Sequence, residues 1–344
     1  MVSHRRPTQP GTSRSARVTV LSAAAATAAA AFGGATANAE PQDTPRTAGA
    51  RVDRLFTEAE QATEQYNRAG ESVARLRGEV RRAQDRAARG QERVNRMRTE
   101  IGTAAREQYR AGGIDPSLAL LLSSDPDSYL DRAATLDRAD HRRATALAGL
   151  RKAQQALAQT RAEAARSLAG LERDRAAVSR HKRTIERKLH QARDLLEELP
   201  GAERSAFDRA SRSGRDGGAA GPVAGLPAGS ARAAAAVMAV QRALGLPYVW
   251  GASGPSGFDC SGLMQWAYAQ VGVSLPRTSQ AQRYAGRMVP LAEARPGDLV
   301  AYRADASHIG MYVGNGQVIH APYPGAPVRY DPVGMMPVSS VTRV

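Results

Sequence analysis

The chain has 344 residues, a net charge of +15 at pH 7, 5% aromatic residues and one cysteine. The single cysteine excludes an intramolecular disulfide framework and Cys-rich zinc motifs, and the six histidines form no HExxH pair, so we expect neither a metal nor another cofactor. The excess of positive charge favours an acidic partner: nucleic acid, anionic lipid or an anionic wall polymer.

The first 39 residues have the three parts of a secretory signal. A basic segment from Met1 to Arg17 precedes a short Ala-rich apolar run, and the segment ends in Ala37-Asn38-Ala39. The run is shorter than the ~20 apolar residues of a spanning helix, so we expect cleavage after Ala39. An uncleaved anchor is the alternative. Arg5-Arg6 raises twin-arginine export, but the polar residues that follow favour the general secretory route. Export argues against nucleic acid as the partner.

Residues 40–200 are expected to form a long helical arm. Apolar residues recur at spacings of three and four in two segments, 52–110 and 136–199, and such sustained heptads predict a coiled coil. An intramolecular antiparallel hairpin is the simplest arrangement, and a dimeric coiled coil is the alternative. The main apolar positions are Val52, Leu55, Ala59, Ala62, Tyr66, Val73, Leu76 and Val80 in the first segment, and Leu136, Leu150, Leu157, Leu171, Val178, Ile185, Ala192 and Leu199 in the second.

The connection between the two helices contains a leucine cluster, Leu118–Leu122. Gly112-Gly113 and two Asp-Pro pairs break the helix on either side of it. Two interpretations stay open: a short helix that folds back on the hairpin, or a docking patch for a membrane partner. After the arm, residues 201–230 are rich in Gly, Ala and Pro and are expected to be a flexible linker.

Residues 231–344 are expected to form an α+β domain. Helices are predicted for 231–244, for 260–271 and, over a short stretch, for 279–284. Strands are predicted for 299–302, 308–313 and 317–320, and Gly314-Asn315-Gly316 is a strong hairpin signal. Helices followed by an antiparallel sheet are typical of the α+β class.

Cys260 is the candidate nucleophile of this domain. It stands where a loop enters a helix, and the helix N-terminus favours the reactive thiolate. His308 and His320 lie at the two ends of the predicted hairpin, which supplies a base and a group that orients it. Asp259 is expected to cap the helix, although its charge opposes thiolate formation. Asp298 is expected to be a turn residue. The alternative is a small buried cysteine and two polar strand ends without chemistry.

The domain resembles the NlpC-type (NlpC/P60) cell-wall cysteine endopeptidases, which have a papain-like fold. The resemblance is carried, in order, by Pro247-Tyr248-Val249-Trp250-Gly251, Phe258-Asp259-Cys260-Ser261-Gly262-Leu263, Leu275-Pro276-Arg277-Thr278-Ser279, Pro296-Gly297-Asp298-Leu299-Val300, His308-Ile309-Gly310-Met311-Tyr312-Val313-Gly314 and Ile319-His320-Ala321-Pro322.

The resemblance implies roles for five residues. Cys260 would be the nucleophile, His308 the base and His320 the orienting residue, while Tyr248 and Ser261 would contact the substrate or the oxyanion. Backbone N–H groups at the start of the Cys260 helix would stabilise the oxyanion. The implied substrate is the peptidoglycan stem peptide, cut commonly after D-glutamate.

The arm resembles that of division-associated wall hydrolases, which implies docking near Leu118–Leu122 on a membrane ABC-transporter-like regulator, and a role in wall remodelling or daughter-cell separation. The flexible linker would let the arm fold over the site, so we predict that the arm inhibits it. An exported coiled-coil adaptor with a wall-binding, non-catalytic domain is the alternative function. A papain-like enzyme that acts on a different amide is a third.

Overall fold

A computed structural model describes residues 45–110, 118, 129–202, 204–205 and 230–344. The predictions for the signal peptide, for the leucine cluster beyond Leu118 and for most of the linker fall outside these residues. Among the helices that are described, none combines the length and the apolar content that crossing a membrane requires.

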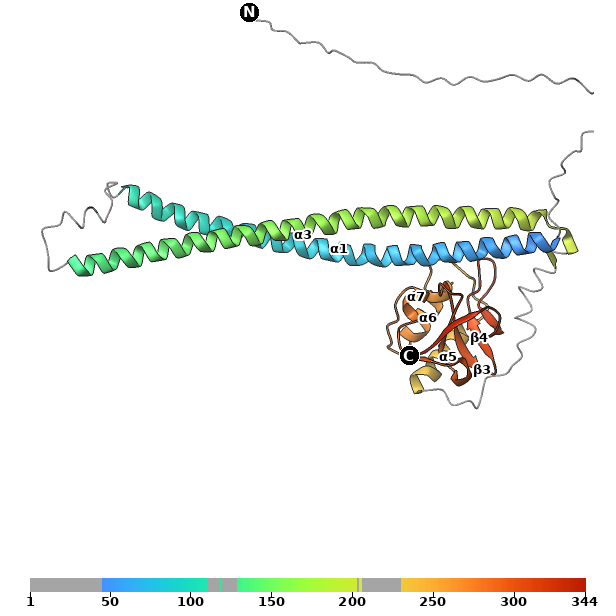
Figure 1. Ribbon diagram of the computed structural model, residues 1–344. Coiled ribbons are helices and arrows are strands. Elements are labelled where there is room, and N and C mark those ends of the chain that lie inside the picture. Colours follow the sequence, from blue (N-terminus) through green and yellow to red (C-terminus); the bar gives the residue numbers. More distant parts are fainter. Residues whose placement is uncertain (1–44, 111–117, 119–128, 203, 206–229) are drawn as a thin grey trace, which may run out of the picture. The chain divides into compact units, whose positions relative to one another are not determined.

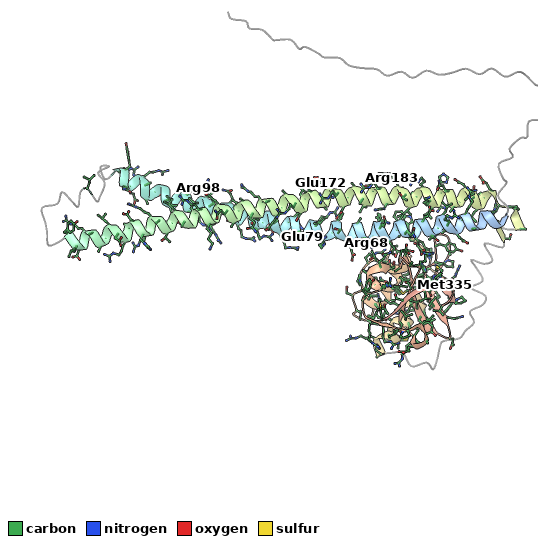
Figure 2. The ribbon with its side chains drawn as sticks, viewed as in Figure 1. Arg68, Glu79, Arg98, Glu172, Arg183 and Met335 are labelled. Carbon is green, nitrogen blue, oxygen red and sulfur yellow. The ribbon has the colours of Figure 1, made fainter. Side chains whose placement is uncertain are left out.

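Two long helices, α1 (Pro45–Arg110) and α3 (Tyr129–Glu198), lie side by side (Figure 1). The first turns of α1 contact the last turns of α3, as the predicted hairpin requires, and a coiled coil in the strict sense stays a prediction. Exposed charged residues such as Arg98, Glu172 and Arg183 cover the outer faces (Figure 2). The buried seam contains Val52, Phe56, Ala59 and Ala62 with Ile185, Leu189 and Ala192, and farther along Val73 and Leu76 with Leu171.

The C-terminal domain has an antiparallel sheet of six described strands in the order β1-β6-β2-β3-β4-β5. The predicted strands are confirmed as β2 (Leu299–Tyr302), β3 (His308–Gly314) and β4 (Gln317–His320). Three further strands were not predicted, because β1 has only three residues and because polar residues interrupt the apolar positions of β5 and β6. They are β1 (Arg287–Val289), β5 (Arg329–Pro332) and β6 (Val338–Arg343).

Helices α5 (Ala231–Arg242) and α6 (Cys260–Ala269) pack on each other and on β3, and the short α7 (Ser279–Gln282) follows. The domain is therefore α+β, as predicted. Phe258, Leu263 and Ile309 belong to the apolar core between α6 and the sheet. This packing fixes the start of α6 against the start of β3, because both elements contribute buried side chains to the same core.

Helix α6 begins at Cys260 because Asp259 caps it. Asp259 is extended (φ −89°, ψ 176°), and its carboxylate accepts a 2.7 Å hydrogen bond from the N–H of Gly262. Gly262 has to be glycine, because a Cβ there would lie 2.1 Å from the carbonyl oxygen of Ala252. The predicted helix cap is therefore confirmed, and it places the thiol at the helix N-terminus.

Candidate active site

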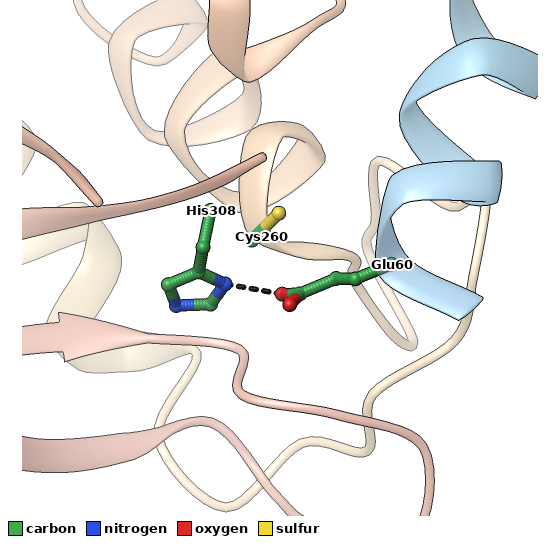
Figure 3. A group of neighbouring side chains, drawn as sticks. All are labelled: Glu60, Cys260 and His308. Atoms are coloured by element: carbon green, nitrogen blue, oxygen red, sulfur yellow. Dashed lines mark hydrogen bonds and ion pairs between the residues drawn. The ribbon is translucent and has the colours of Figure 1, made fainter. Parts of the chain in front are cut away.

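The thiol of Cys260 is buried at the start of α6, and His308 at the start of β3 lies next to it. One donor atom each of Cys260, His308 and Glu60 lies within 4.8 Å of the other two (Figure 3). The structure thus brings the predicted nucleophile and the predicted base together. It adds the carboxylate of Glu60 from α1, which lies 200 positions before Cys260 in the sequence.

His320, at the end of β4, lies directly behind His308. Nε2 of His308 is 2.7 Å from Nδ1 of His320, and Nε2 of His320 is 2.7 Å from Oδ2 of Asp331 on β5. Asp331 also accepts a 2.8 Å hydrogen bond from Nε of Arg329. The sheet register brings Gly310 opposite His320, and a Cβ at Gly310 would lie 3.2 Å from the Cβ of His320. The two predicted histidines are therefore hydrogen-bonded in a chain that Asp331 ends.

The hydrogen bonds of this chain indicate its protonation. Burial lowers the pKa of His320 to about 4, so its imidazole is neutral near pH 7. Hydrogen bonds from His320 and Arg329 hold the pKa of Asp331 below its usual value despite burial. Asp331 is therefore ionised and accepts a hydrogen bond from the Nε2–H group of His320. Nδ1 of His320 is then an acceptor, and Nε2 of His308 has to donate to it.

His308 also contacts a carboxylate through its second nitrogen. Nδ1 of His308 is hydrogen-bonded to Oε1 of Glu60, and Arg303 donates to Oε2 of Glu60 at 2.7 Å. Burial alone would raise the pKa of Glu60, but His308 and Arg303 together hold it below its usual value. Glu60 is therefore ionised and accepts the hydrogen bond from Nδ1 of His308. Both ring nitrogens of His308 are thus occupied by hydrogen bonds, and neither is free to accept the thiol proton.

Two further buried residues of α1 reach the site from the same helix face, since they follow Glu60 by four and seven positions. Oε1 of Glu64 accepts a 2.7 Å hydrogen bond from Oγ of Ser261 and lies 3.7 Å from Sγ of Cys260. Oε2 of Glu64 accepts a 2.8 Å hydrogen bond from the N–H of Ser279. Asn67 donates to Asp259 at 3.1 Å. Helix α1 therefore fills the space in front of the thiol.

The thiol of Cys260 is not ionised in this arrangement, which corrects the expectation from the sequence. Burial raises the pKa of Cys260 well above its usual value, and the carboxylates of Glu64, Glu60 and Asp259 raise it further. Arg277 opposes this effect but does not offset it. Three nearby carboxylates and the loss of water outweigh the helix N-terminus, which alone would favour the thiolate.

Arg277 connects the polar residues beside the thiol, a role that no local sequence signal predicts. Its Nη1 donates to Oδ1 of Asp259 and to Oγ of Ser261, both at 2.9 Å. Tyr248 is buried, and both burial and the nearby Cys260 raise the pKa of its phenol well above the usual value. Tyr248 belongs to the same buried core cluster as Cys260, and Ser261 follows Cys260 directly in α6. Their role toward substrate or oxyanion stays a prediction.

Asp298 lies outside this group. Its carboxylate accepts a hydrogen bond from the N–H of Arg295 at 2.8 Å and pairs with Arg343 at 2.7 Å. The turn role predicted for Asp298 is confirmed, and the ion pair additionally connects this turn to β6.

The residues of the site are those of a thiol-dependent acyl-transfer centre. A thiol lies at a helix N-terminus, an imidazole lies beside it, and a second imidazole with a carboxylate fixes the orientation of the first. The helix start also supplies backbone N–H groups where an oxyanion would form. Helix α1 covers this set, because Glu60 occupies Nδ1 of His308 and Glu64 lies beside the thiol.

Comparison with known proteins agrees with this geometry. The NlpC/P60 family profile matches residues 245–341. A protein of Corynebacterium glutamicum (strain R), named probable endopeptidase, is 46% identical over 124 residues, which make up 34% of this chain and 59% of that protein. The peptidoglycan endopeptidase RipA of Mycolicibacterium smegmatis is 45% identical over 118 residues, 29% of this chain and 23% of that protein.

Among solved structures, NlpC2 from Trichomonas vaginalis is 40% identical, and the match covers 34% of this chain and 48% of that chain with a TM-score of 0.32. The chain spans 59% of the length of the C. glutamicum relative and less of RipA.

Proposed function

Because residues 245–341 of this chain form a domain of the NlpC/P60 family, we propose that the protein is a cysteine endopeptidase that cleaves the stem peptides of peptidoglycan. The observation that carries the proposal is the grouping of Cys260, His308 and His320 at the start of α6. The names of two relatives, probable endopeptidase and peptidoglycan endopeptidase, support the same reaction class.

The reaction requires that α1 leave the site. When Glu60 withdraws, the Nδ1 proton of His308 passes to solvent, and the freed Nδ1 then takes the proton of the thiol, which gives a thiolate and an imidazolium. The thiolate attacks the peptide carbonyl carbon, and the negative oxygen that forms is stabilised by N–H groups at the start of α6. His308 then protonates the leaving amine as the C–N bond breaks. Water, deprotonated by His308, hydrolyses the thioester and regenerates the thiol.

Cleavage after D-glutamate is supported by the surroundings of Glu64. Burial and the nearby Asp259 raise the pKa of this carboxyl, while hydrogen bonds from Oγ of Ser261 and the N–H of Ser279 and the charge of Arg277 counteract the rise. These groups are suited to hold a carboxylate next to the thiol. We infer that the carboxylate of a D-glutamate residue occupies this position in the substrate complex, where Glu64 lies when α1 is docked.

Helix α1 is proposed to keep the enzyme latent. Glu60, Glu64 and Asn67 occupy the substrate side of the thiol, and Glu60 takes the hydrogen bond of His308 that the thiol needs. Both effects disappear together if the arm moves away, so the same contact blocks substrate entry and suppresses the nucleophile.

We also propose where the protein acts and in which process. The signal-like first 39 residues support secretion, and the net charge of +15 suits attachment to an anionic wall or a membrane surface. Wall remodelling or daughter-cell separation is the proposed role. A membrane ABC-transporter-like regulator that binds the arm near Leu118–Leu122 is the proposed means of moving α1.

The test uses full-length protein in which α1 is displaced. Glu60→Lys places a cation against Arg303 and His308, so it should open the site, whereas the exposed Glu92 on the same helix provides the control Glu92→Lys. Purified peptidoglycan is digested with each variant, and the fragments are identified by mass spectrometry. We expect fragments cut after D-glutamate from Glu60→Lys and almost none from Glu92→Lys.

The double variant Glu60→Lys, Cys260→Ala distinguishes a cysteine peptidase from a non-catalytic adaptor. The double variant should release no fragments and should retain the folded domain, measured by circular dichroism. Fragment release that does not depend on Cys260 would refute the peptidase. Wall binding without any release from Glu60→Lys would favour the adaptor.

A further inference from the structure

The closed site contains three metal-binding side chains of three different kinds. A carboxylate oxygen of Glu60, Sγ of Cys260 and a ring nitrogen of His308 lie within 4.8 Å of one another, and all three residues are buried. Figure 3 shows them converging from α1, from the start of α6 and from β3. No sequence motif predicts this set, because its members are separated by 200 and 48 positions.

The kinds of donor select the metal. Zn²⁺ binds thiolate, imidazole and carboxylate at about 2.3, 2.0 and 2.1 Å, so donors around one tetrahedral ion lie about 3–4 Å apart. The spacing in the closed site needs only small movements to reach these values. Ca²⁺ and Mg²⁺ require oxygen ligands and are disfavoured by a thiol and an imidazole. Three protein ligands leave the fourth position for a water molecule.

His320, Asp331 and Arg303 form hydrogen bonds that orient the proposed metal ligands His308 and Glu60. Nε2 of His308 is hydrogen-bonded to His320, which leaves Nδ1, the nitrogen facing Glu60, to bind the ion. His320 is fixed in turn by Asp331 at 2.7 Å, and Glu60 is held by Arg303 at 2.7 Å. Hydrogen bonds of this type fix the ring orientation of a ligand and strengthen metal binding.

We propose that the closed protein binds one Zn²⁺ through Cys260, His308 and Glu60, and that the ion fastens helix α1 to the catalytic domain. Zn²⁺ takes the place of the thiol proton and of the Nδ1 proton of His308, and both protons go to solvent. Two ligands belong to the catalytic domain and one to the arm, so the metal binds most tightly when α1 is docked. The ion therefore stabilises the docked state.

The proposed metal site depends only on the positions of its three ligands. The further claim that zinc keeps a peptidase latent rests on the proposed function. The two are tested separately because zinc binding is measured without any substrate.

The binding experiment uses the full chain. Zn²⁺ affinity and stoichiometry are measured by competition with a chromophoric zinc chelator for wild type, Glu60→Gln, Cys260→Ser, and the control Glu92→Gln on the exposed face of α1. We expect one tightly bound ion in wild type and in the control. Glu60→Gln should weaken binding at least about tenfold, as expected for loss of a ligand. Cys260→Ser should weaken it by at least as much.

A second measurement reports the ligands directly. Co²⁺ in place of Zn²⁺ should give a thiolate-to-cobalt absorption band that Cys260→Ser abolishes. Hydrogen exchange of the full chain should slow in α1 around Glu60 when Zn²⁺ is added to wild type, and not in Glu60→Gln. Circular dichroism confirms that each variant is folded.

Equal affinity of wild type and Glu60→Gln would overturn the proposal, since the ion would then bind without the arm. Equal affinity of wild type and Cys260→Ser would overturn it as well, by placing the ion elsewhere. If zinc binds as expected but Glu60→Lys releases no wall fragments, the metal site stands and the proposed peptidase function fails.

Discussion

The carboxylate of Glu60 on α1 accepts a hydrogen bond from Nδ1 of His308 on β3, across 248 positions of sequence. Nδ1 is the nitrogen that a cysteine peptidase needs for the proton of its thiol. While Glu60 occupies it, burial and the surrounding carboxylates keep the pKa of Cys260 raised and the thiol neutral. One helix thus covers the proposed nucleophile and also occupies its proposed base.

Asp331 is expected to act through His320. It fixes the neutral His320 with the proton on Nε2, so that Nδ1 of His320 is directed at His308. Asp331→Asn, made in the opened Glu60→Lys protein, should lower kcat about 100-fold and leave KM nearly unchanged, because the base loses its orientation and the substrate contacts remain. Steady-state hydrolysis of a stem-peptide substrate measures both constants.

The matched control for Asp331→Asn is Glu293→Gln, which removes an exposed carboxylate of the same domain in the 3₁₀ turn Leu291–Glu293. It should leave kcat unchanged. A kcat for Asp331→Asn within a factor of two of the parent would show that His320 needs no partner.

The docking of α1 should weaken as the pH rises. Burial and the nearby Asp259 raise the pKa of Glu64 from 4.5 to about 7 in the docked state, while Ser261, Ser279 and Arg277 counteract the rise. A displaced Glu64 in water regains its ordinary pKa, so the docked state binds more protons between about pH 4.5 and 7. The contribution of Glu64 to the stability of the docked state is fully present below this pH window and is lost as the pH rises through 7.

Between pH 5 and pH 8 the ratio of open to docked protein should rise on the order of 10- to 100-fold. Small-angle X-ray scattering in EDTA measures this ratio without metal. Glu64→Gln stays neutral at every pH and should flatten the dependence. The same pH dependence in wild type and Glu64→Gln would assign the effect to another group.

The candidate site could be predicted from the sequence where the signals are local. The Gly314-Asn315-Gly316 turn fixes the hairpin whose strands carry His308 and His320, and Asp259 marks the helix start at Cys260. Each of these features depends on backbone preferences within a few residues. The thiol and both histidines were therefore found together.

The residues of α1 could not be found in the same way. In the sequence these three residues look like ordinary polar positions of a helix surface, because the partners of Glu60, Glu64 and Asn67 are 248, 197 and 192 positions away. Phe56 is the one sequence feature that hints at a contact of α1 with the C-terminal domain, because it is an aromatic residue next to the heptad positions. Its ring stacks on that of Tyr323, with the ring centroids 4.8 Å apart. Non-local docking also explains why the thiol is neutral in the docked arrangement and is not the predicted thiolate.

The hydroxyl of Tyr268 is expected to stabilise the domain without taking part in the reaction. It donates a 2.6 Å hydrogen bond to the carbonyl of Gly297, and the pair is buried. Tyr268→Phe leaves that carbonyl without its partner and should lower the free energy of unfolding by about 1–2 kcal/mol. Tyr284→Phe alters a tyrosine that is 68% exposed and should change it little.

Urea denaturation followed by tryptophan fluorescence measures this stability, because both tryptophans, Trp250 and Trp266, lie in the catalytic domain. Equal losses for the two tyrosine variants would show that the buried hydrogen bond contributes nothing specific.

The reactivity of the single thiol tests most directly whether α1 suppresses the nucleophile. Full-length wild type, Glu60→Lys and the control Glu92→Lys are treated with iodoacetamide at pH 7 in EDTA, and modification of Cys260 is followed by mass spectrometry. Wild type and Glu92→Lys should react slowly, and Glu60→Lys should react at least about tenfold faster, because opening exposes the thiol and restores its base. Equal rates for wild type and Glu60→Lys would contradict the account.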